Sequence, residues 1–288
     1  MPDAAYYNGK YTTLDQLQVS PDDRAFVFGD GVYEVVKVLD GKFFALEHHL
    51  DRLYRSLKGV EIAPPGPRDE VKAILAKLLT DSGYRNALIY FHVSRGVAPR
   101  KHYYPAPETA PSFVAWAKEF GGSPKELHAN GVKAITVLDQ RWDKAWIKSL
   151  NLLPNCMASD AAHRVGAYEA ILVGRDGIVN ECSSSNLFAV IDGVVRTAPK
   201  TRNILWGISR LVTINCAKAA GIPLEERAFA VHEMLNAEEV FLTSTSPDVL
   251  PIVDVDGHRI GDGKPGPVSQ RLLELFRHYI KTGEYSKG

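Results

Sequence analysis

Turn signals between apolar runs divide the first third of the chain into strands and helices. Asn8-Gly9 predicts a tight hairpin at residues 6–10, because this pair favours the left-handed backbone that such turns need. Asp40-Gly41 predicts a second hairpin in the same way, between strand-like runs at 32–39 and 42–45. We therefore expect antiparallel pairing near the start of the chain.

Helical spacing follows these strands. Leucines recur every three or four residues over 46–59, which predicts an amphipathic helix. A second apolar face at residues 71–79 predicts another helix, with Gly83 as its end. Strand-like runs return at 87–94 and 112–117.

The second part of the chain also alternates between turns and apolar runs. Aspartate-glycine pairs predict three hairpins, across residues 167–181, 187–197 and 252–260. A strand is expected at 240–243, and helices are expected at 207–221 and 268–280.

So many local hairpins favour antiparallel or mixed sheets over a regular strand–helix alternation, so we expect an α/β protein of the α+β kind. The stretch from Glu119 to Pro124 contains two glycines, a serine and a proline, which is typical of a linker. We expect a small α/β domain at 1–120, a linker at 121–131 and a larger domain at 132–288.

Composition narrows the possible functions. The 288 residues include 34 basic and 34 acidic ones, so nothing suggests the basic patch of a nucleic-acid binder. The apolar runs are too short for a membrane span, and the first four residues have no signal-peptide pattern. Cys156, Cys182 and Cys216 lack disulfide or zinc-ligand spacing. We expect a cytoplasmic protein with reduced thiols and no metal.

Lys148 lies within the apolar segment 146–153. A lysine at such a place can extend its amine to solvent along the surface. If it is instead buried, the neutral amine becomes a nucleophile towards carbonyl carbons, as Schiff-base chemistry requires. The residue by itself leaves both alternatives open.

Glu181 begins the polar stretch 181–186 between two predicted strands. This stretch is either a polar turn or a set of ligand-binding groups. In the second case the carboxylate could keep a ring nitrogen protonated, while Ser183, Ser184, Ser185 and Asn186 supply hydrogen-bond donors.

Three places suit an anion such as a phosphate. Ile208-Ser209 opens a predicted helix, whose free N–H groups favour an anion. Ser244-Thr245 follows a predicted strand, and Arg52 projects from the helix at 46–59 with a guanidinium suited to bidentate contact. Each can equally be a helix cap, a turn or a surface arginine.

Two further places could bind a substrate. Arg100 and His102 follow the turn 95–99 and could hold a carboxylate, or they could be solvated loop residues. Tyr33 begins a strand after Gly29 and Gly31 and could reach a ligand, although a core position is common for tyrosine.

Together and in this order, these segments resemble the class IV aminotransferases, the fold-type IV pyridoxal-phosphate (PLP) enzymes. The resemblance extends from about residue 20 to about residue 270. The most specific elements are the lysine segment, the glutamate-serine-asparagine segment and the arginine-histidine loop, I-K-S-L-N-L-L (147–153), E-C-S-S-S-N (181–186) and R-G-V-A-P-R-K-H (95–102). The third of these most resembles the D-amino-acid enzymes of the class. Other matched stretches are 28–35, 49–54, 90–94, 168–180, 187–188, 204–210 and 241–245.

The resemblance implies a small α/β domain joined to a larger one with a barrel-like mixed sheet, and a role for each residue. Lys148 would carry PLP as a Schiff base and act as the catalytic base, and Glu181 would pair with the pyridine nitrogen. Leu205 would lie against the cofactor ring. The phosphate would be held by Arg52, Ile208, Ser209, Ser244 and Thr245. The substrate carboxylate would be bound by Tyr33, Arg100 and His102, the last two from the partner subunit of a homodimer.

The expected reaction is a ping-pong transamination between D-amino acids, such as D-alanine or D-glutamate, and 2-oxo acids, such as 2-oxoglutarate or pyruvate. Branched-chain L-amino-acid transaminase, (R)-amine transaminase and aminodeoxychorismate lyase are alternatives with the same fold, and a non-catalytic PLP-binding dimer is another. Cys182 stands where the D-amino-acid enzymes carry glycine, so its side chain is expected to crowd a turn near the cofactor.

Overall fold

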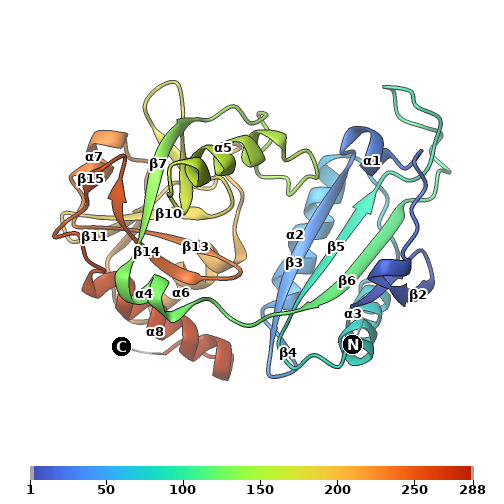
Figure 1. Ribbon diagram of the computed structural model, residues 1–288, viewed down its shortest axis with the longest axis horizontal. Coiled ribbons are helices and arrows are strands. Elements are labelled where there is room, and N and C mark those ends of the chain that lie inside the picture. Colours follow the sequence, from blue (N-terminus) through green and yellow to red (C-terminus); the bar gives the residue numbers. More distant parts are fainter. Residues whose placement is uncertain (1–2, 287–288) are drawn as a thin grey trace. The chain divides into compact units, whose positions relative to one another are not determined.

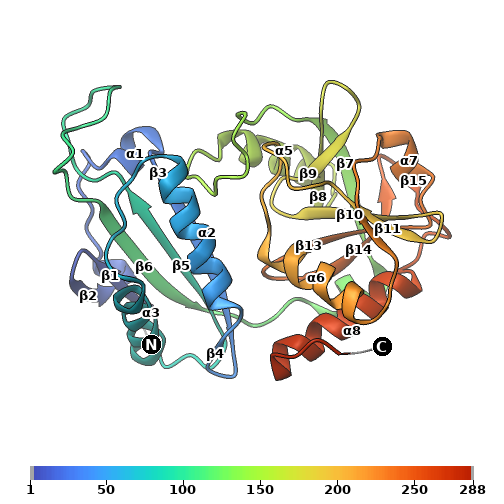
Figure 2. The ribbon, with the colours of Figure 1, turned by 180° about the vertical axis from the view of Figure 1, so that it is seen from behind.

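The computed structural model describes residues 3–286, shown from opposite sides in Figures 1 and 2. The chain forms two compact units. Unit 1 comprises residues 3–121 and Ile147–Leu152, and unit 2 comprises Gly122–Trp146 and residues 153–286. Met1 and Pro2, part of the segment on which the signal-peptide expectation rests, lie outside the described residues.

The helices and strands alternate irregularly along the chain. The helices are α1 (Arg24–Phe28), α2 (Leu46–Gly59), α3 (Arg68–Ser82), α4 (Lys125–Asn130), α5 (Leu153–Arg164), α6 (Ile208–Ala219), α7 (Val231–Leu235) and α8 (Pro267–Thr282), with a 3-10 turn at Leu14–Gln16. The strands of unit 1 are β1 (Ala4–Tyr7), β2 (Lys10–Thr13), β3 (Gly31–Leu39), β4 (Lys42–Phe43), β5 (Ala87–Ser94) and β6 (Ser112–Glu119). The strands of unit 2 are β7 (Val132–Leu138), β8 (Glu169–Val173), β9 (Val179–Cys182), β10 (Asn186–Ile191), β11 (Val194–Thr197), β12 (Leu224–Glu226), β13 (Glu239–Ser244), β14 (Asp248–Val255) and β15 (His258–Arg259).

Unit 1 is an antiparallel sheet with the strand order β2-β1-β6-β5-β3-β4. Helix α2 packs on β3 and α3 packs on β1 and β6, so both helices cover one face, as Figure 2 shows. Side chains alternate between the faces of a strand. On β3, Val32, Val36 and Val38 are fully buried, and Glu34 shares their face. Tyr33 therefore lies on the opposite face.

Unit 2 is a curled mixed sheet with the order β12-β11-β10-β13-β14-β7-β8-β9. The pairs β14–β7, β7–β8 and β11–β12 are parallel, and the other neighbours are antiparallel. A mixed sheet agrees with the expectation from the hairpins. The inner surface forms a core that includes Val132, Leu187 and Leu250.

Helices cover the outer surface of this curled sheet. Ala170 and Leu172 of β8 point outward to Ala158 and Ala162 of α5, whereas Ile171 points into the inner core. On other strands, α6 and α8 pack on β13 and β14, as well as on each other.

The two compact units divide the chain differently from the expected domains in two places. The predicted linker 121–131 contains α4 and packs on unit 2, since Ser123 Oγ donates to Ser246 O at 2.9 Å and Leu127 contacts the inner core. The predicted larger domain 132–288 loses Ile147–Leu152 to unit 1, because this segment forms backbone hydrogen bonds with β3. Neither effect is visible in a local sequence pattern.

The three cysteines are free thiols, with Cys182 and Cys216 buried and Cys156 exposed. In the part of the chain that the structure describes, no helix combines the length and apolarity needed to cross a membrane.

Candidate active site

Lys148 lies on an extended segment beside the start of β3. The backbone N–H of Tyr33 donates to Lys148 O at 2.9 Å, and that of Leu150 donates to Gly31 O at 3.0 Å. The Lys148 side chain is half-buried, and Nζ lies 4.0 Å from the centroid of the Tyr33 ring. Within the described part of unit 1, no carboxylate forms an ion pair with this amine. It is therefore held over an aromatic face without a negative partner.

Aromatic side chains continue from Tyr33 across the same face of the sheet. Tyr33 stacks on Tyr90 with 5.6 Å between ring centroids, and Tyr90 stacks on Trp116 at 4.1 Å. His92 contacts both Tyr90 and Trp116, and burial lowers the pKa of His92 to about 4. This surface is apolar and uncharged around neutral pH.

The opposite face of β3 carries a buried charged cluster. Glu34 accepts hydrogen bonds from Arg52 Nε and Nη2, both at 2.7 Å, and pairs with His49 Nδ1 at 2.7 Å. Burial acts to raise the pKa of Glu34, but the Arg52 charge and the hydrogen bonds from Arg52 and His49 lower it to about 2. Arg52, the predicted phosphate ligand, is thus a buried arginine fixed by a bidentate carboxylate.

Arg100 and His102 are exposed on the loop after β5, and both contact the ring of Phe28. Neither of them contacts Tyr33 within residues 3–286. The structure therefore brings Tyr33 together with Lys148 in one subunit, but it does not bring Arg100 or His102 to them.

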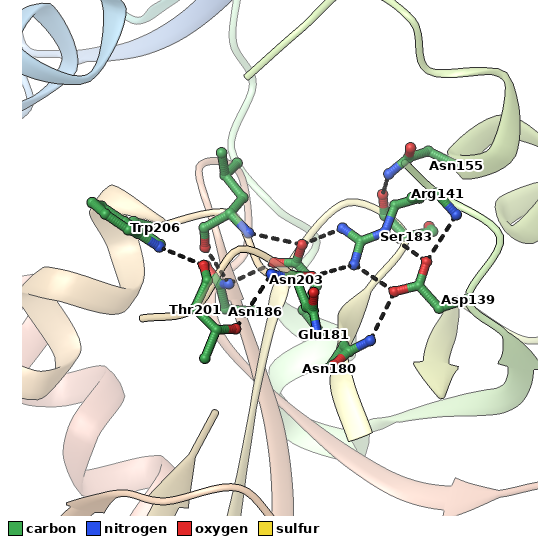
Figure 3. Close-up of polar contacts among 11 residues, drawn as sticks. Asp139, Arg141, Asn155, Asn180, Glu181, Ser183, Asn186, Thr201, Asn203 and Trp206 are labelled. Carbon is green, nitrogen blue, oxygen red and sulfur yellow. Dashed lines mark hydrogen bonds and ion pairs between the residues drawn. The ribbon is translucent and has the colours of Figure 1, made fainter. Parts of the chain in front are cut away.

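In unit 2, Glu181 is the centre of the network in Figure 3. It lies on β9 with its side chain 4% exposed. Its Oε1 accepts from Arg141 Nη1 and from the backbone N–H of Leu205 at 2.9 Å, and Oε2 accepts from Asn186 Nδ2 at 2.7 Å. The carboxylate is thereby fixed in one orientation.

Arg141 is shared between two acids. Its Nε and Nη2 donate to Asp139 at 3.0 and 2.8 Å, and Nη2 also donates to the carbonyl of Asn203. Asn180 donates to Asp139 at 2.9 Å as well. Asp139, Arg141 and Glu181 together carry one net negative charge when both acids are ionised, which suits a cationic partner.

Glu181 has an unusual proton affinity. Burial raises its pKa, the Arg141 charge and the hydrogen bonds from Leu205 and Arg141 lower it, and Asp139 raises it again. The net result is a pKa of about 7. Such a group exchanges a proton near neutral pH.

Asn186 joins Glu181 to the predicted phosphate ligands. It donates to the carbonyl of Leu205 at 2.8 Å and is paired with Thr243 in the β10–β13 register. Its Oδ1 also fills the space that a side chain on Gly207 would need, so glycine is required before α6. The Asn186 side chain therefore lies close to Leu205, to the α6 N-terminus and to the end of β13.

The α6 N-terminus and the end of β13 have the features of an anion site. The first N–H groups of a helix have no intrahelical acceptor, and these belong to Ile208 and Ser209 here. Ser244 ends β13 and Thr245 follows it, both half-buried. Thr243 Oγ1 is buried and has no hydrogen-bond partner. These groups fit a phosphate.

The three serines after Cys182 do not point to a ligand. Ser184 and Ser185 donate to Glu169 at 2.9 Å, and Ser183 donates to the same buried carboxylate. They fix the turn between β9 and β10 and are not free donors for a cofactor.

The Cys182 side chain does not crowd this turn, contrary to expectation. It lies 1% exposed in the inner core of unit 2, and its φ is not positive. Burial raises the pKa of its thiol, so it acts as a small apolar group.

Four functional neighbours were missed from the sequence. Glu34 had a signal, because it is a charge at a core position of an apolar strand. Asp139, Arg141 and Glu169 had none, because Asp139-Gln140-Arg141 resembles any polar loop and Glu169 resembles any strand end. The candidate residues fall into two groups: Tyr33, Arg52, Arg100, His102 and Lys148 are in unit 1, and Glu181, Leu205, Ile208, Ser209, Ser244 and Thr245 are in unit 2.

Known relatives are similar to this protein over nearly the whole length of its chain. A D-alanine aminotransferase of Staphylococcus haemolyticus is 40% identical over 277 residues, covering 96% of this chain and 98% of the relative. A D-alanine aminotransferase of Bacillus licheniformis is 41% identical over 274 residues, covering 95% and 96%.

Solved structures agree in fold. The Escherichia coli branched-chain amino acid aminotransferase has a TM-score of 0.91 at 26% identity, covering 99% of this chain and 97% of that one. A T.th. branched-chain amino acid aminotransferase, solved with pyridoxamine 5'-phosphate, has a TM-score of 0.89 at 27% identity, covering 97% and 94%. The fold is therefore that of the fold-type IV PLP enzymes.

The family described as amino-transferase class IV matches residues 31–255, which include Lys148 and Glu181. Together with the relatives, this match shows that the chain belongs to the class IV aminotransferases.

Proposed function

We propose that this protein is a PLP-dependent transaminase that exchanges amino groups between D-amino acids and 2-oxo acids by a ping-pong mechanism. The observation that carries the proposal is the amine of Lys148, held 4.0 Å from the Tyr33 ring with no carboxylate partner in the described part of its unit. The full-length similarity to D-alanine aminotransferases supports the D-amino-acid substrate. We place the activity in the cytoplasm.

The groups present fit PLP. Lys148 would hold it covalently, Glu181 would face its ring nitrogen, and Leu205 would lie against its ring. The phosphate would be held by Arg52, Ile208, Ser209, Ser244 and Thr245. When bound, PLP supplies an electron sink for negative charge at the substrate Cα.

The charge of Glu181 and its neighbours supports a role at the ring nitrogen. With Arg141 and Asp139 it forms a buried network of one net negative charge, and its pKa of about 7 matches a group that shares a proton with a pyridine nitrogen. The hydrogen bonds from Leu205 and Asn186 keep the carboxylate from rotating.

Lys148 would move the reacting proton. Its amine, which lies 4.0 Å from the centroid of the Tyr33 ring, would take the proton from the substrate Cα. Tyr33 lies beside the amine, and we propose that its hydroxyl contacts the substrate carboxylate.

The substrate carboxylate would be bound by Tyr33 together with Arg100 and His102 of a second subunit. This makes the functional unit a homodimer. Fixing the carboxylate on one side decides which enantiomer directs its Cα–H towards Lys148, and this is the physical basis for D-selectivity.

The direct test replaces the lysine. Lys148→Ala should abolish both the yellow absorbance of the lysine-bound cofactor and the formation of pyruvate from D-alanine with 2-oxoglutarate. The exposed Lys144, four residues earlier, gives a matched control, and Lys144→Ala should retain both. Full activity in Lys148→Ala would refute the proposal.

Branched-chain transamination is the second candidate, because the similar solved structures are branched-chain enzymes. A panel of D-alanine, D-glutamate, L-leucine and (R)-1-phenylethylamine separates it from the D-amino-acid and (R)-amine activities. Aminodeoxychorismate lyase activity would appear as the release of pyruvate from aminodeoxychorismate, with no 2-oxo acid present to accept an amino group. Turnover of L-leucine with none of D-alanine would replace our assignment.

A further inference from the structure

The loop after β5 lies against the short helix α1, where two of its side chains contact the ring of Phe28. The guanidinium carbon of Arg100 lies 5.3 Å from the centroid of the Phe28 ring, and the His102 ring centroid lies 5.5 Å from it. The two residues that we propose for the substrate carboxylate therefore share one contact, although both are exposed.

The Phe28 ring is itself held firmly. Asp23 caps α1 by accepting from the backbone N–H of Ala25 at 2.8 Å, and Gly29 ends the helix in the left-handed conformation. The guanidinium carbon of Arg24 lies 4.7 Å from the ring centroid. The helix that carries the ring is thus capped at both ends, and Arg24 of the same helix contacts the ring.

Asp30 connects the loop to this helix through hydrogen bonds. It accepts from Arg24 Nε at 2.7 Å and from Arg95 Nε at 2.8 Å, so it holds the loop start and α1 together. Arg24 Nη1 also donates to the carbonyl of Lys101 at 2.7 Å, between the two carboxylate-binding candidates. Arg24 is buried, which strengthens these charged contacts.

Gly96 has a backbone conformation that lets the loop turn away from the end of β5. Its φ is +100°, and a side chain there would collide with the carbonyl of Ala110. Its own carbonyl accepts from the backbone N–H of Arg24 at 3.0 Å. The loop backbone is therefore held at Gly96 by the backbone of Arg24 and at Lys101 by its side chain, and Phe28 contacts the side chains of Arg100 and His102.

We propose that Phe28 is a positioning residue for recognition of the substrate carboxylate, acting through Arg100 and His102. Long exposed side chains lose rotamer entropy when they bind, and an aromatic face that already attracts them reduces this loss. The inference rests on the proposed function, because it takes Arg100 and His102 as the carboxylate ligands.

The test compares two substrates that differ only in the carboxylate. D-Alanine carries it, whereas D-alaninol has a hydroxymethyl group in its place. Phe28→Leu should raise the KM for D-alanine and for pyruvate about five- to tenfold with little change in kcat, since a cation–aromatic contact of this kind is lost. The rate of amino transfer from D-alaninol, followed by the cofactor absorbance, should be unchanged.

Two variants control for the substitution. Phe28→Tyr keeps the ring and should retain the wild-type KM. Phe26→Leu makes the same change on the same helix at a side chain that is 75% exposed, and it should retain the wild-type KM as well. If D-alanine and D-alaninol lose activity equally in Phe28→Leu, the role is structural and the proposal is wrong.

Hydrogen exchange separates this inference from the proposed function. Amides at residues 100–103 should exchange several-fold faster in Phe28→Leu than in the wild type, because side-chain packing of the loop is lost. A wild-type protein inactive towards D-alanine would refute the proposed function. Unchanged exchange together with an unchanged KM in Phe28→Leu would refute the positioning role alone.

Discussion

Two buried glutamates, one in each unit, are paired with an arginine but differ in proton affinity. Glu34 has a pKa of about 2, whereas Glu181 has a pKa of about 7, and both are removed from solvent. Burial raises the pKa of each, so the difference comes from the partners.

The two arginines differ in how their guanidinium nitrogens are distributed among acidic side chains. Arg52 donates from two of its nitrogens to Glu34, and His49 adds a third contact to the same carboxylate. Arg141 gives Nε and Nη2 to Asp139 and only Nη1 to Glu181. An arginine that neutralises one acid stabilises its charge, whereas one shared by two acids leaves a net negative charge. The first arrangement anchors an arginine, and the second suits a protonated ligand.

Removing the shared arginine should have the largest effect. Arg141→Met leaves Asp139 and Glu181 buried without a counter-charge, so the free energy of unfolding should fall by about 3–5 kcal/mol. Denaturant unfolding at pH 7 measures this loss. Arg164→Met, which breaks an exposed pair with Asp160, should cost less than about 1 kcal/mol. Equal losses would contradict the comparison.

The pH dependence of stability should have opposite signs for the two glutamates. The pKa of Glu34 is depressed from 4.5, so its contribution is present above pH 4.5 and is lost as the pH falls towards 2. The pKa of Glu181 is raised, so its contribution is present below pH 4.5 and is lost as the pH rises through 7. Each contribution is about 3 kcal/mol if the unfolded values are ordinary.

Unfolding curves of Glu34→Gln and Glu181→Gln across pH 3 to 8 measure these contributions as differences from the wild type. The Glu34 difference should vary below pH 5, and the Glu181 difference should vary between pH 5 and pH 8. Parallel curves for the two variants would show that the partners do not distinguish the acids.

Asp139 competes with Glu181 for Arg141, and removing its charge should have a smaller effect on stability than removing the arginine. In Asp139→Asn, Arg141 serves Glu181 alone, so the pKa of Glu181 should fall and its titration should move to lower pH. The amide retains part of the hydrogen bonding, so the stability cost should be about 1–2 kcal/mol. The pH at which stability declines reports the shift. A titration that moves upward would refute the role assigned to Asp139.

The smallest effect on the pKa of Glu181 is expected from a substitution at the next residue, Cys182. Cys182→Gly introduces the glycine that the resemblance to the D-amino-acid enzymes implies at this position, but it also removes a side chain packed in the inner core. Stability should fall by about 1–2 kcal/mol, while the pKa of Glu181 is unchanged because no charge is altered. Thermal unfolding and the pH profile together check both statements. A more stable variant would restore the idea of a crowded turn.

Much of the fold could be predicted because its signals are local. Asn8 and Gly9 form the expected turn with positive φ angles of 45° and 91°, and the leucine pattern gave α2 at Leu46–Gly59. Helix α5 was not predicted, because only its small alanines Ala158 and Ala162 are buried and they give a weak apolar pattern. The parallel partners of β7 were also hidden, since β8 and β14 are distant in sequence.

The candidate site was predicted as residues but not as a network. The sequence singled out Lys148 and Glu181, and its resemblance to a family supplied their expected roles. It gave no sign that Ser183, Ser184 and Ser185 would all donate to Glu169. Such contacts depend on which strands lie side by side.

The sequence by itself determined the hairpins, the long amphipathic helices and the family, because turn chemistry and periodicity act over a few residues and motifs are read directly. Only the tertiary structure decided how each charge is neutralised. Glu34 and Glu181 are the same residue type, but Glu34 is bound by two nitrogens of Arg52 whereas Glu181 shares Arg141 with Asp139. Electrostatic energy in a buried site depends on distance and solvent exclusion, which follow from the assembly of strands remote in sequence.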